Sequence, residues 1–518
     1  MLNFLKKNWL VTTILVIGII LRCYQFGSIP APSNQDEISA GYESYSLLTQ
    51  GTDRWGYKFP AYFLSWGSGQ NVLQSYLSIP VMAVMGLNIY SIRLIPLFIN
   101  ILTLPLFYFL LKKFSEPEKL RSQVAVLGLT ILAFSPWHIM MGRWALESNL
   151  APFFVILGIF ALYESIHSKS KLKIYLALIP FALAFYAYAI TFFVVPIFLG
   201  LVFLVNYRQN LIKKYSISIL IFLSIAFPFL LFLVKNYFLK TELPFESNLP
   251  FSIPLLAESR LDQIQNGSIF YTILVNILLI VNNFFDGIVA NMISGPLRYI
   301  SPIPLGIIGW LTIAIYFFKD KIYKQKNNLL MLFSICCIIL FLIPMNMNRA
   351  NILYLPIIGI FASAFVNLTY KYLKIIFPFS ICFFILLGFL FGYQYFNNYN
   401  TVSSLRFNAR FDEAFLEAQN TAKTENINYI FITDNMYLNY MYFLNNKQLK
   451  PDIWRQESTI DGVNVLNTDN FYFTEKSIIA LKKDFVFLEK SPLNISNYCQ
   501  RPVILKKVDF WIIGKCVM

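Results

Sequence analysis

Charged residues are scarce in this chain. Asp, Glu, Lys and Arg make up 13% of its 518 residues, about half of the roughly 25% that is usual in soluble proteins. Hydrophobic residues reach 57%, and 51 residues are Phe. So little polar surface cannot cover a soluble globule of this size. The composition excludes an ordinary cytosolic enzyme and a disordered protein, and it predicts an α-helical polytopic membrane protein.

Histidine and cysteine are also few, with two His and six Cys. His138 and His167 fall in stretches predicted on opposite sides of the membrane, which excludes a His-rich metal site. Six Cys are too few for a disulfide scaffold. Cys499 and Cys516 lie in the polar tail, where a disulfide would require export, and the sequence leaves their state open. No phosphate-binding loop or dinucleotide fingerprint is present, so nothing indicates a cytosolic nucleotide site.

Long apolar runs are abundant instead. A run of about 17 residues or more can cross a bilayer as a helix. Eleven runs are predicted to do so: 9–24, 93–111, 123–140, 150–166, 174–189, 190–206, 216–234, 302–318, 328–345, 350–368 and 375–393. Two further runs, 72–87 and 269–285, are shorter or interrupted by polar residues.

The basic residues orient these spans. They cluster at 6–7, 112–121, 169–173, 208–214, 319–326 and 371–374. The positive-inside rule places these clusters in the cytoplasm, so the chain must cross an even number of times between them. The runs 72–87 and 269–285 are therefore predicted to stay on the outer side, within long outer loops near 25–92 and 235–301. The N-terminus is predicted to be cytoplasmic, and the net charge of +15 needs no nucleic-acid partner.

The composition changes beyond Tyr393. Residues 397–518 are rich in Asp and Asn and contain strand-like runs at 429–432 and 485–488. Apolar residues from 410 to 423 recur at helical spacing. We therefore predict a transmembrane domain over residues 1–396, followed by a small extracytoplasmic α/β domain over residues 397–518.

Polar side chains recur at the predicted outer ends of the spans. They lie in four connections: Asp36 and Glu37 after the first span, Arg93 at the start of the second, Arg143, Glu147 and Asn149 between the third and fourth, and Arg349 between the ninth and tenth. Polar residues near a membrane are costly and usually face a cavity or a partner. The pattern predicts a functional site at the outer membrane face.

The adjacent acids Asp36 and Glu37 are the sharpest feature. One could act as a general base for an acceptor hydroxyl or amine, and the other could bind the acceptor or a metal ion. The structural alternative is a helix cap and a first-turn acid that complements the helix dipole.

The outer arginines Arg93, Arg143 and Arg349 suit a phosphate, because the guanidinium fork matches phosphoryl oxygens. Their alternative is snorkelling to the membrane interface. Glu147 follows Arg143 by four residues, so a helical ion pair is its structural alternative.

Several segments resemble the bacterial protein O-mannosyltransferase-like and aminoarabinose-transferase-like membrane glycosyltransferases, which have the C-type fold. The resemblance covers about the first 370 residues as architecture. The matching residues are Leu21-Arg22, Asp36-Glu37, Tyr76–Pro80, Gly86–Asn88, Ser91–Leu94, Ser135–His138, Arg143, Glu147–Asn149, Phe185–Tyr188, Ile303–Gly306 and Asn348–Pro356. Glu147 stands where many relatives have Asp, and the Lys that several relatives place near Tyr188–Thr191 is absent here.

The resemblance implies an inverting glycosyltransferase that uses a polyprenyl-phosphate sugar donor at the extracytoplasmic face of the cell membrane. It assigns the base role to Asp36, and we expect Glu37 or Glu147 to bind the acceptor or a divalent metal. Substrate-binding residues are then Arg93, Arg143, Glu147, Asn149, Tyr188 and Arg349. The acceptor is a glycan, a lipid or a protein of the cell envelope. The alternatives are a transporter or flippase for a lipid-linked sugar and a non-catalytic envelope-assembly protein.

Overall fold

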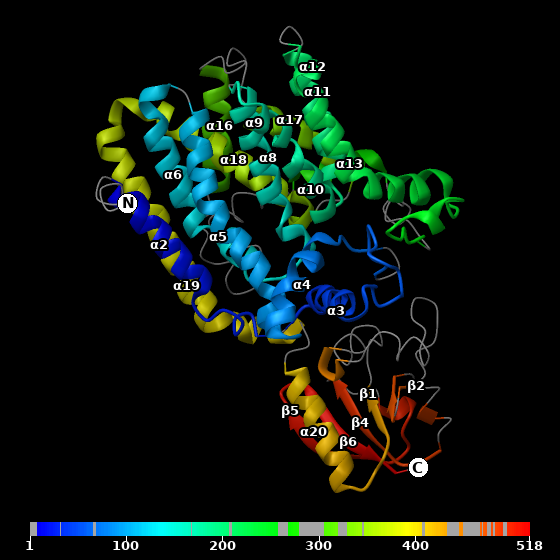
Figure 1. The fold of residues 1–518 in the computed structure, drawn as a ribbon. Coiled ribbons are helices and arrows are strands. Elements are labelled where there is room, and N and C mark those ends of the chain that lie inside the picture. The colour runs from blue at the N-terminus through cyan, green and yellow to red at the C-terminus, as the bar shows by residue number, and fades with distance from the viewer. Residues whose placement is uncertain are drawn as a thin grey trace.

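The computed structural model has a helical part and a C-terminal sheet (Figure 1). It describes residues 8–31, 33–65, 69–115, 117–166, 168–206, 210–256, 268–278, 305–319, 329–343, 346–406, 410–432, 445–448, 467–468, 470–473, 478–479, 482–490 and 495–517. His167 and the predicted segment 279–285 lie outside these residues.

The helical part extends to Arg406. Its α-helices are α2 (Trp9–Cys23), α3 (Gln35–Gln50), α4 (Leu73–Met85), α5 (Ile89–Phe114), α6 (Arg121–Phe134), α7 (Pro136–Met141), α8 (Ala151–Ile166), α9 (Lys171–Leu176), α10 (Ile179–Ala187), α11 (Thr191–Val205), α12 (Leu211–Lys214), α13 (Ser216–Leu233), α16 (Leu305–Lys319), α17 (Leu329–Cys336), α18 (Met347–Leu368) and α19 (Leu373–Arg406). Short turns of other helix types include η2 (Glu147–Asn149), η4 (Val234–Leu239), η5 (Glu246–Asn248) and η8 (Cys337–Leu342).

Five helices among the described residues are long and apolar enough to cross a membrane: Ile89–Phe114, Glu147–Ile166, Ser216–Leu239, Asn348–Leu368 and Tyr370–Thr401. Each overlaps a predicted span. Shorter apolar helices overlap other predicted spans, so a multi-pass membrane protein is confirmed, while the number of eleven stays a prediction. α19 continues to Arg406, so the predicted boundary at 396/397 falls inside a helix.

The predicted span 123–140 is not one continuous helix. α6 ends at Phe134, and Ser135 is extended with ψ 122° before α7 begins at Pro136. A residue that precedes proline is disfavoured in the helical conformation, because the proline ring collides with its backbone. After α7, the short turn η2 contacts α8, α10 and α18.

The first outer segment holds two helices, α3 and α4, which pack against each other. α4 has 13 residues, which gives a length of about 20 Å at 1.5 Å per residue, against roughly 30 Å of hydrocarbon. Such a helix is too short to cross alone, as expected for a segment that stays on one side.

The two predicted outer loops contact each other. The Ser252 amide donates to the Lys58 carbonyl at 2.8 Å, and the Ala61 amide donates to the Ser252 carbonyl at 3.3 Å. In the second loop, the buried Lys235 forms ion pairs with Glu242 and Glu246. These contacts place the loops at one end of the helical part, in agreement with their prediction on one side.

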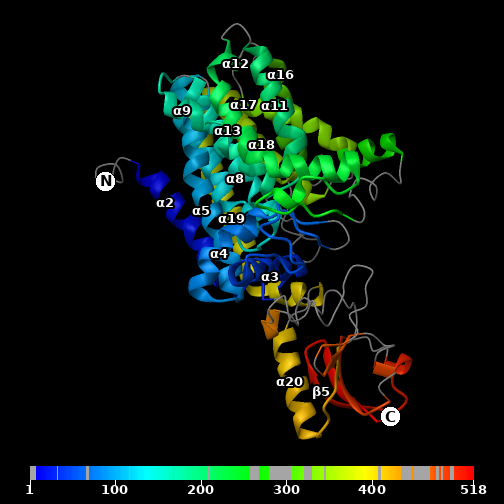
Figure 2. The same cartoon turned by 45° about the vertical axis from the view of Figure 1, so that its right-hand side comes forward.

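The C-terminal sheet lies at the same end of the helical part as α3 and α4 (Figures 1 and 2). Tyr45 of α3 donates its hydroxyl to the Gln448 carbonyl at 2.9 Å. The sheet has the order β2-β3-β1-β4-β6-β5, with β2 (Asn467–Thr468), β3 (Phe471–Tyr472), β1 (Ile430–Ile432), β4 (Phe485–Lys490), β6 (Trp511–Cys516) and β5 (Pro502–Val508). β1 is parallel to β3 and β4, and the other neighbours are antiparallel.

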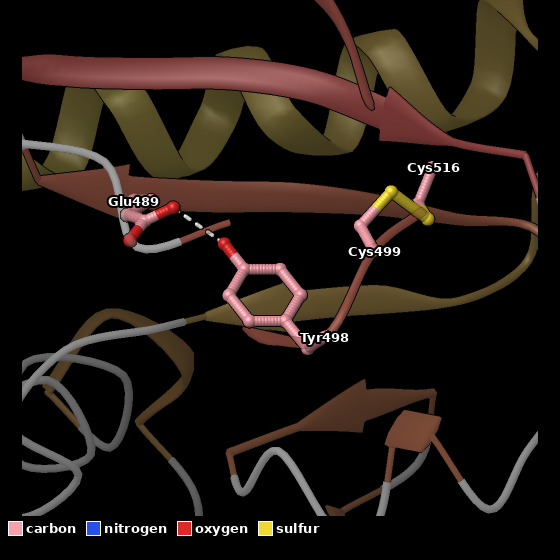
Figure 3. The surroundings of a disulfide bond; sticks show 4 residues. All are labelled: Glu489, Tyr498, Cys499 and Cys516. Carbon is pink, nitrogen blue, oxygen red and sulfur yellow. Dashed lines mark hydrogen bonds between the residues drawn. A yellow bond between two sulfur atoms is a disulfide. The ribbon is translucent and has the colours of Figure 1, made fainter. Parts of the chain in front are cut away.

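Helix α20 (Phe411–Thr424) packs on the sheet through the apolar face that its helical spacing predicts. Cys499 and Cys516 form a disulfide that joins the segment before β5 to the end of β6 (Figure 3). Beside it, the Tyr498 hydroxyl donates to the buried Glu489 carboxylate of β4. The structure thus assigns the bridge that the sequence left open.

Candidate active site

A cavity of about 180 Å³ opens where three of the four predicted connections meet the turn that carries Tyr188. Its lining residues come from α3 and the segment before α4, from the connection after α7, from the turn between α10 and α11, and from the start of α18. They are Asp36, Gln70, Leu146, Glu147, Ser148, Tyr188, Asn346, Asn348 and Arg349. The structure therefore brings together four of the predicted site residues, namely Asp36, Glu147, Tyr188 and Arg349.

Asp36 lies in the first turn of α3. Asn34 caps this helix, and its side-chain oxygen accepts from the Asp36 amide at 2.8 Å. The helix N-terminus carries partial positive charge, which favours the ionised form of a nearby carboxylate. Asp36 is half-buried at the cavity wall. The structural alternative is thus present in part, because Asp36 and Glu37 are first-turn acids and Glu37 completes the capping box that Asn34 begins.

Glu37 points away from the cavity. Its carboxylate accepts two hydrogen bonds from Arg93, from Nε at 2.8 Å and from an Nη at 2.9 Å. It also accepts from the Ala145 amide at 2.8 Å and from the Asn34 amide at 3.0 Å. Neighbouring helix positions lie about 100° apart, so when Asp36 faces the cavity Glu37 faces the interior. The geometry supports a positioning role for Glu37.

Arg93 is fully buried in α5 and does not line the cavity. Besides Glu37, its guanidinium donates to the Pro30 carbonyl at 2.7 Å and lies over the Trp144 ring. Arg93 therefore ties the segment before α3 to the connection after α7, rather than presenting its charge to a ligand.

Arg143 and Asn149 are also committed to the backbone. All three nitrogens of the Arg143 guanidinium donate to carbonyls, those of Arg22, Gln25 and Ile29, at 2.8 to 3.0 Å. Burial lowers the pKa of Arg143 from its ordinary value. The Asn149 amide donates to two carbonyls of the preceding connection. Neither residue lines the cavity.

Glu147 starts a short 3-10 turn at the cavity wall, and the segment 142–146 before it is not helical. The alternative of an ion pair between Arg143 and Glu147 on one helix is therefore wrong, because no helix joins the two residues. The Glu147 carboxylate accepts from the Asn71 amide. The Asn71 side chain in turn donates to the Phe185 carbonyl at 2.9 Å and accepts from the Ala189 amide at 3.0 Å. Asn71 thus fixes the turn that carries Tyr188 to the segment that carries Glu147.

Arg349 lies at the start of α18. Asn346 caps this helix by accepting from the Arg349 amide at 2.9 Å. Asn346, Asn348 and Arg349 all line the cavity. Arg349 is the basic residue among the described lining residues, so the cavity combines two carboxylates, one guanidinium and several amides.

Sequence reasoning missed Gln70 and Asn71. The preceding Gly69 does not by itself indicate a ligand. A Cβ at Gly69 would lie 2.3 Å from the Tyr62 ring and 2.8 Å from the Phe63 carbonyl oxygen, so this close approach requires glycine. Only the folded structure shows that Gln70 reaches the cavity.

A divalent metal fits the described residues poorly. Of the two residues expected as ligands, Glu147 lines the cavity, while Glu37 is bound by Arg93. No group of three or more His, Cys, Asp or Glu able to hold an ion occurs within the described part of the chain. We therefore derive no step through a metal.

No protein-family model matches the sequence, and no curated protein matches it either. Solved structures do. ArnT, the aminoarabinose transferase from Cupriavidus metallidurans, matches in the apo state with a TM-score of 0.61, 10% identity and coverage of 98% of both chains. The same protein bound to undecaprenyl phosphate matches at 0.60 over 98% of this chain and 97% of its own.

The oligosaccharyltransferase AglB from Archaeoglobus fulgidus, in complex with an inhibitory peptide and a dolichol-phosphate, also matches. Its TM-score is 0.52 at 12% identity, and the match covers 86% of this chain and 64% of AglB. These likenesses establish the fold. The chain shares the fold of ArnT and AglB, in agreement with the architecture that its sequence resemblance predicted.

Proposed function

We propose that the protein is an inverting glycosyltransferase that moves a sugar from a polyprenyl-phosphate donor to an acceptor at the extracytoplasmic membrane face. The observation that carries the proposal is the cavity that combines Asp36 and Glu147 with Arg349. The solved structures support it, because ArnT binds undecaprenyl phosphate and shares this fold over nearly its whole length. The acceptor remains a glycan, a lipid or a protein.

In this mechanism Asp36 accepts the proton of the acceptor hydroxyl or amine. The acceptor atom attacks the anomeric carbon on the face opposite the phosphate, which inverts the configuration. The bond from the anomeric carbon to the phosphate oxygen breaks, and its electron pair stays on the phosphate. Arg349 stabilises the polyprenyl phosphate that leaves. Glu147 and Tyr188 orient the acceptor or the sugar, while Glu37, Arg93, Arg143 and Asn149 hold the cavity wall in place.

The extracytoplasmic location has independent support. The C-terminal domain carries the Cys499–Cys516 disulfide, and disulfides persist mainly in oxidising compartments. Tyr45 connects this domain to α3, which carries Asp36. The domain, α3 and the cavity therefore belong to the same side.

The test is Asp36→Asn in purified protein. The probes are undecaprenyl-phosphate hexoses as donors and an envelope extract from cells that lack the protein as the acceptor source, with products followed by mass spectrometry. Loss of a general base should lower transfer by about 10²-fold or more. Stability should fall by no more than about 1 kcal/mol, the scale of a lost first-turn charge.

Asp412 is the matched control. It occupies the same first-turn position in α20, away from the cavity, so Asp412→Asn removes the same charge from a helix start. We expect Asp412→Asn to transfer sugar at the wild-type rate. Near-normal turnover of Asp36→Asn would remove Asp36 from the mechanism. Wild-type protein that moves labelled donor between leaflets without forming product would favour a transporter.

A further inference from the structure

Gln70 lines the same cavity, and nothing in the mechanism above uses it. Its side chain is 3% exposed, and its amide nitrogen donates to the Asp36 carbonyl at 3.1 Å. That carbonyl can only accept, so the nitrogen of the Gln70 amide must face Asp36 and its oxygen must face elsewhere. Among the described residues, this Oε1 atom has no hydrogen-bond partner.

The position of Gln70 is rigid. Its amide and carbonyl form a reciprocal pair of backbone hydrogen bonds with Phe63, each at 2.9 Å. The preceding Gly69 lets the two segments approach this closely. A group held by its backbone and by one end of its side chain loses little freedom on binding, which favours recognition by the other end.

A free amide oxygen inside the protein is not sufficient evidence for a ligand. Gln74, four residues later in α4, has the same property. It is 2% exposed, and its side-chain nitrogen donates to the Ser78 hydroxyl and to the Ile92 carbonyl. Its Oε1 also has no hydrogen-bond partner among the described residues. Gln74 does not line the cavity, whereas Gln70 does. The cavity is the second observation, because it is the space from which a hydrogen-bond donor can arrive.

We infer that Gln70 binds a hydroxyl group of a sugar substrate through Oε1. An amide oxygen accepts hydrogen bonds and cannot donate them, so it suits a hydroxyl and does not suit an ionised phosphate. The carboxylates of Asp36 and Glu147 share this preference, and Arg349 has the opposite one. Oε1 is covered by its neighbours in the empty cavity. We expect these neighbours to move when the hydroxyl binds, while the Gln70 amide nitrogen keeps its hydrogen bond to the Asp36 carbonyl.

The cavity therefore has two chemically different parts, one that accepts hydrogen bonds from sugar hydroxyls and one that binds phosphate. This inference rests on the proposed function and deepens it. The hydroxyl belongs either to the sugar of the donor or to a glycan acceptor, and both supply the same chemistry.

The test compares Gln70→Met with Gln74→Met, which remove the same groups from neighbouring sites of similar burial. Binding of undecaprenyl phosphate and of undecaprenyl-phosphate hexoses is measured by native mass spectrometry, and the KM for envelope extract is measured in the transfer assay. Monodeoxy donor sugars identify the hydroxyl, because deleting both partners of a hydrogen bond should cost less than the sum of the single deletions.

Gln70→Met should bind undecaprenyl phosphate within about twofold of wild type. If the hydroxyl is on the donor, hexose-lipid affinity should fall about tenfold, and if it is on the acceptor, the KM for extract should rise about tenfold. Gln74→Met should change neither quantity. Gln70→Asn keeps the amide but shortens the side chain by one methylene. It should change the hexose-lipid affinity or the KM in the same direction as Gln70→Met, and it replaces the Met variant in the test if that variant misfolds.

Three results would overturn the inference. They are equal effects of the two Met variants, no effect of Gln70→Met in either arm, and loss of undecaprenyl phosphate binding in Gln70→Met. Failure of the proposed function is separate, because wild-type protein would then form no glycosylated product from any donor of the panel.

Discussion

Two sets of polar residues at the outer end of the helical part make an instructive comparison. The cavity set, Asp36, Gln70, Glu147, Tyr188 and Arg349, lines open space. The bracing set, Glu37, Arg93, Arg143 and Asn149, is buried and bound to itself or to backbone carbonyls. Both sets contain acids and at least one arginine, and Asp36 and Glu37 come from the same connection. Residue type alone therefore does not separate residues that meet a substrate from residues that hold the site.

The comparison predicts opposite consequences for the same kind of substitution. A change in the bracing set should lower stability, and activity should fall because the fold is lost. A change at Asp36 or Arg349, the partly exposed members of the cavity set, should lower binding or turnover and affect stability less. Three measurements, beginning with the largest expected effect, test this division.

Arg93→Met should have the largest effect. It leaves the Glu37 carboxylate buried without its ion-pair partner, and breaking a buried pair in this way costs about 3–5 kcal/mol. Thermal unfolding of purified protein in detergent should show a strong loss of stability. Arg349→Met is the control from the cavity set and should lose less stability than Arg93→Met, because Arg349 is only partly buried. If Arg93→Met and wild type unfold at the same temperature, the proposed difference between the two sets is wrong.

Arg349→Gln should have an intermediate effect. Hydrogen bonds to charged groups contribute about 1.5–3 kcal/mol, so undecaprenyl phosphate should bind roughly 10-fold to 100-fold more weakly. Titration followed by native mass spectrometry measures this. Arg121→Gln, on the predicted cytoplasmic side, should bind the lipid like wild type. If both variants bind undecaprenyl phosphate normally, Arg349 does not contact the phosphate.

Asp53→Asn should have the smallest effect and a different pH dependence. Burial, and then the charge of Glu43, raise the pKa of Asp53 well above its ordinary value, and Arg54 opposes this shift. A raised carboxyl pKa favours the folded state below the unfolded pKa of about 3.9, and this contribution is lost as pH rises through the folded pKa.

The Asn side chain can still accept from the Trp55 and Tyr57 amides that Asp53 binds. The Asn variant should therefore be as stable as wild type or slightly more stable at neutral pH. Its melting temperature should fall less between pH 5 and pH 8 than that of wild type. A steeper fall in the variant would contradict the direction of the shift.

The sequence was sufficient to predict that polar residues from several connections gather at one end of the helical part. Charge parity and apolar runs place Asp36, Glu147, Tyr188 and Arg349 at one end of the bundle, and the structure brings them to one cavity. In the tail, helical spacing and β-rich runs predicted α20, β1 and β4. These predictions succeed because each depends on a local pattern or on a simple count of crossings.

The division between the two sets could not be read from the sequence. Asp36 and Glu37 are neighbours, and only the rotation of α3 decides which of them faces the cavity. Arg93 and Arg349 look alike until their partners are known. Gln70 depends on the pairing of its turn with Phe63. Each of these outcomes is set by contacts between distant segments, which a single sequence does not display.

The hydrogen bonds between Lys58 and Ser252 also have a consequence for how the protein is made. These residues are 194 positions apart, so the ribosome has synthesised nearly half of the chain before the first loop meets its partner. Arg349 follows about a hundred residues later still. During insertion, the first outer loop is therefore made long before Ser252 and Arg349 can contact it. In nascent chains halted before residue 252, the Lys58 and Ala61 amides lack their Ser252 acceptors, so they should exchange hydrogen faster than in the finished protein.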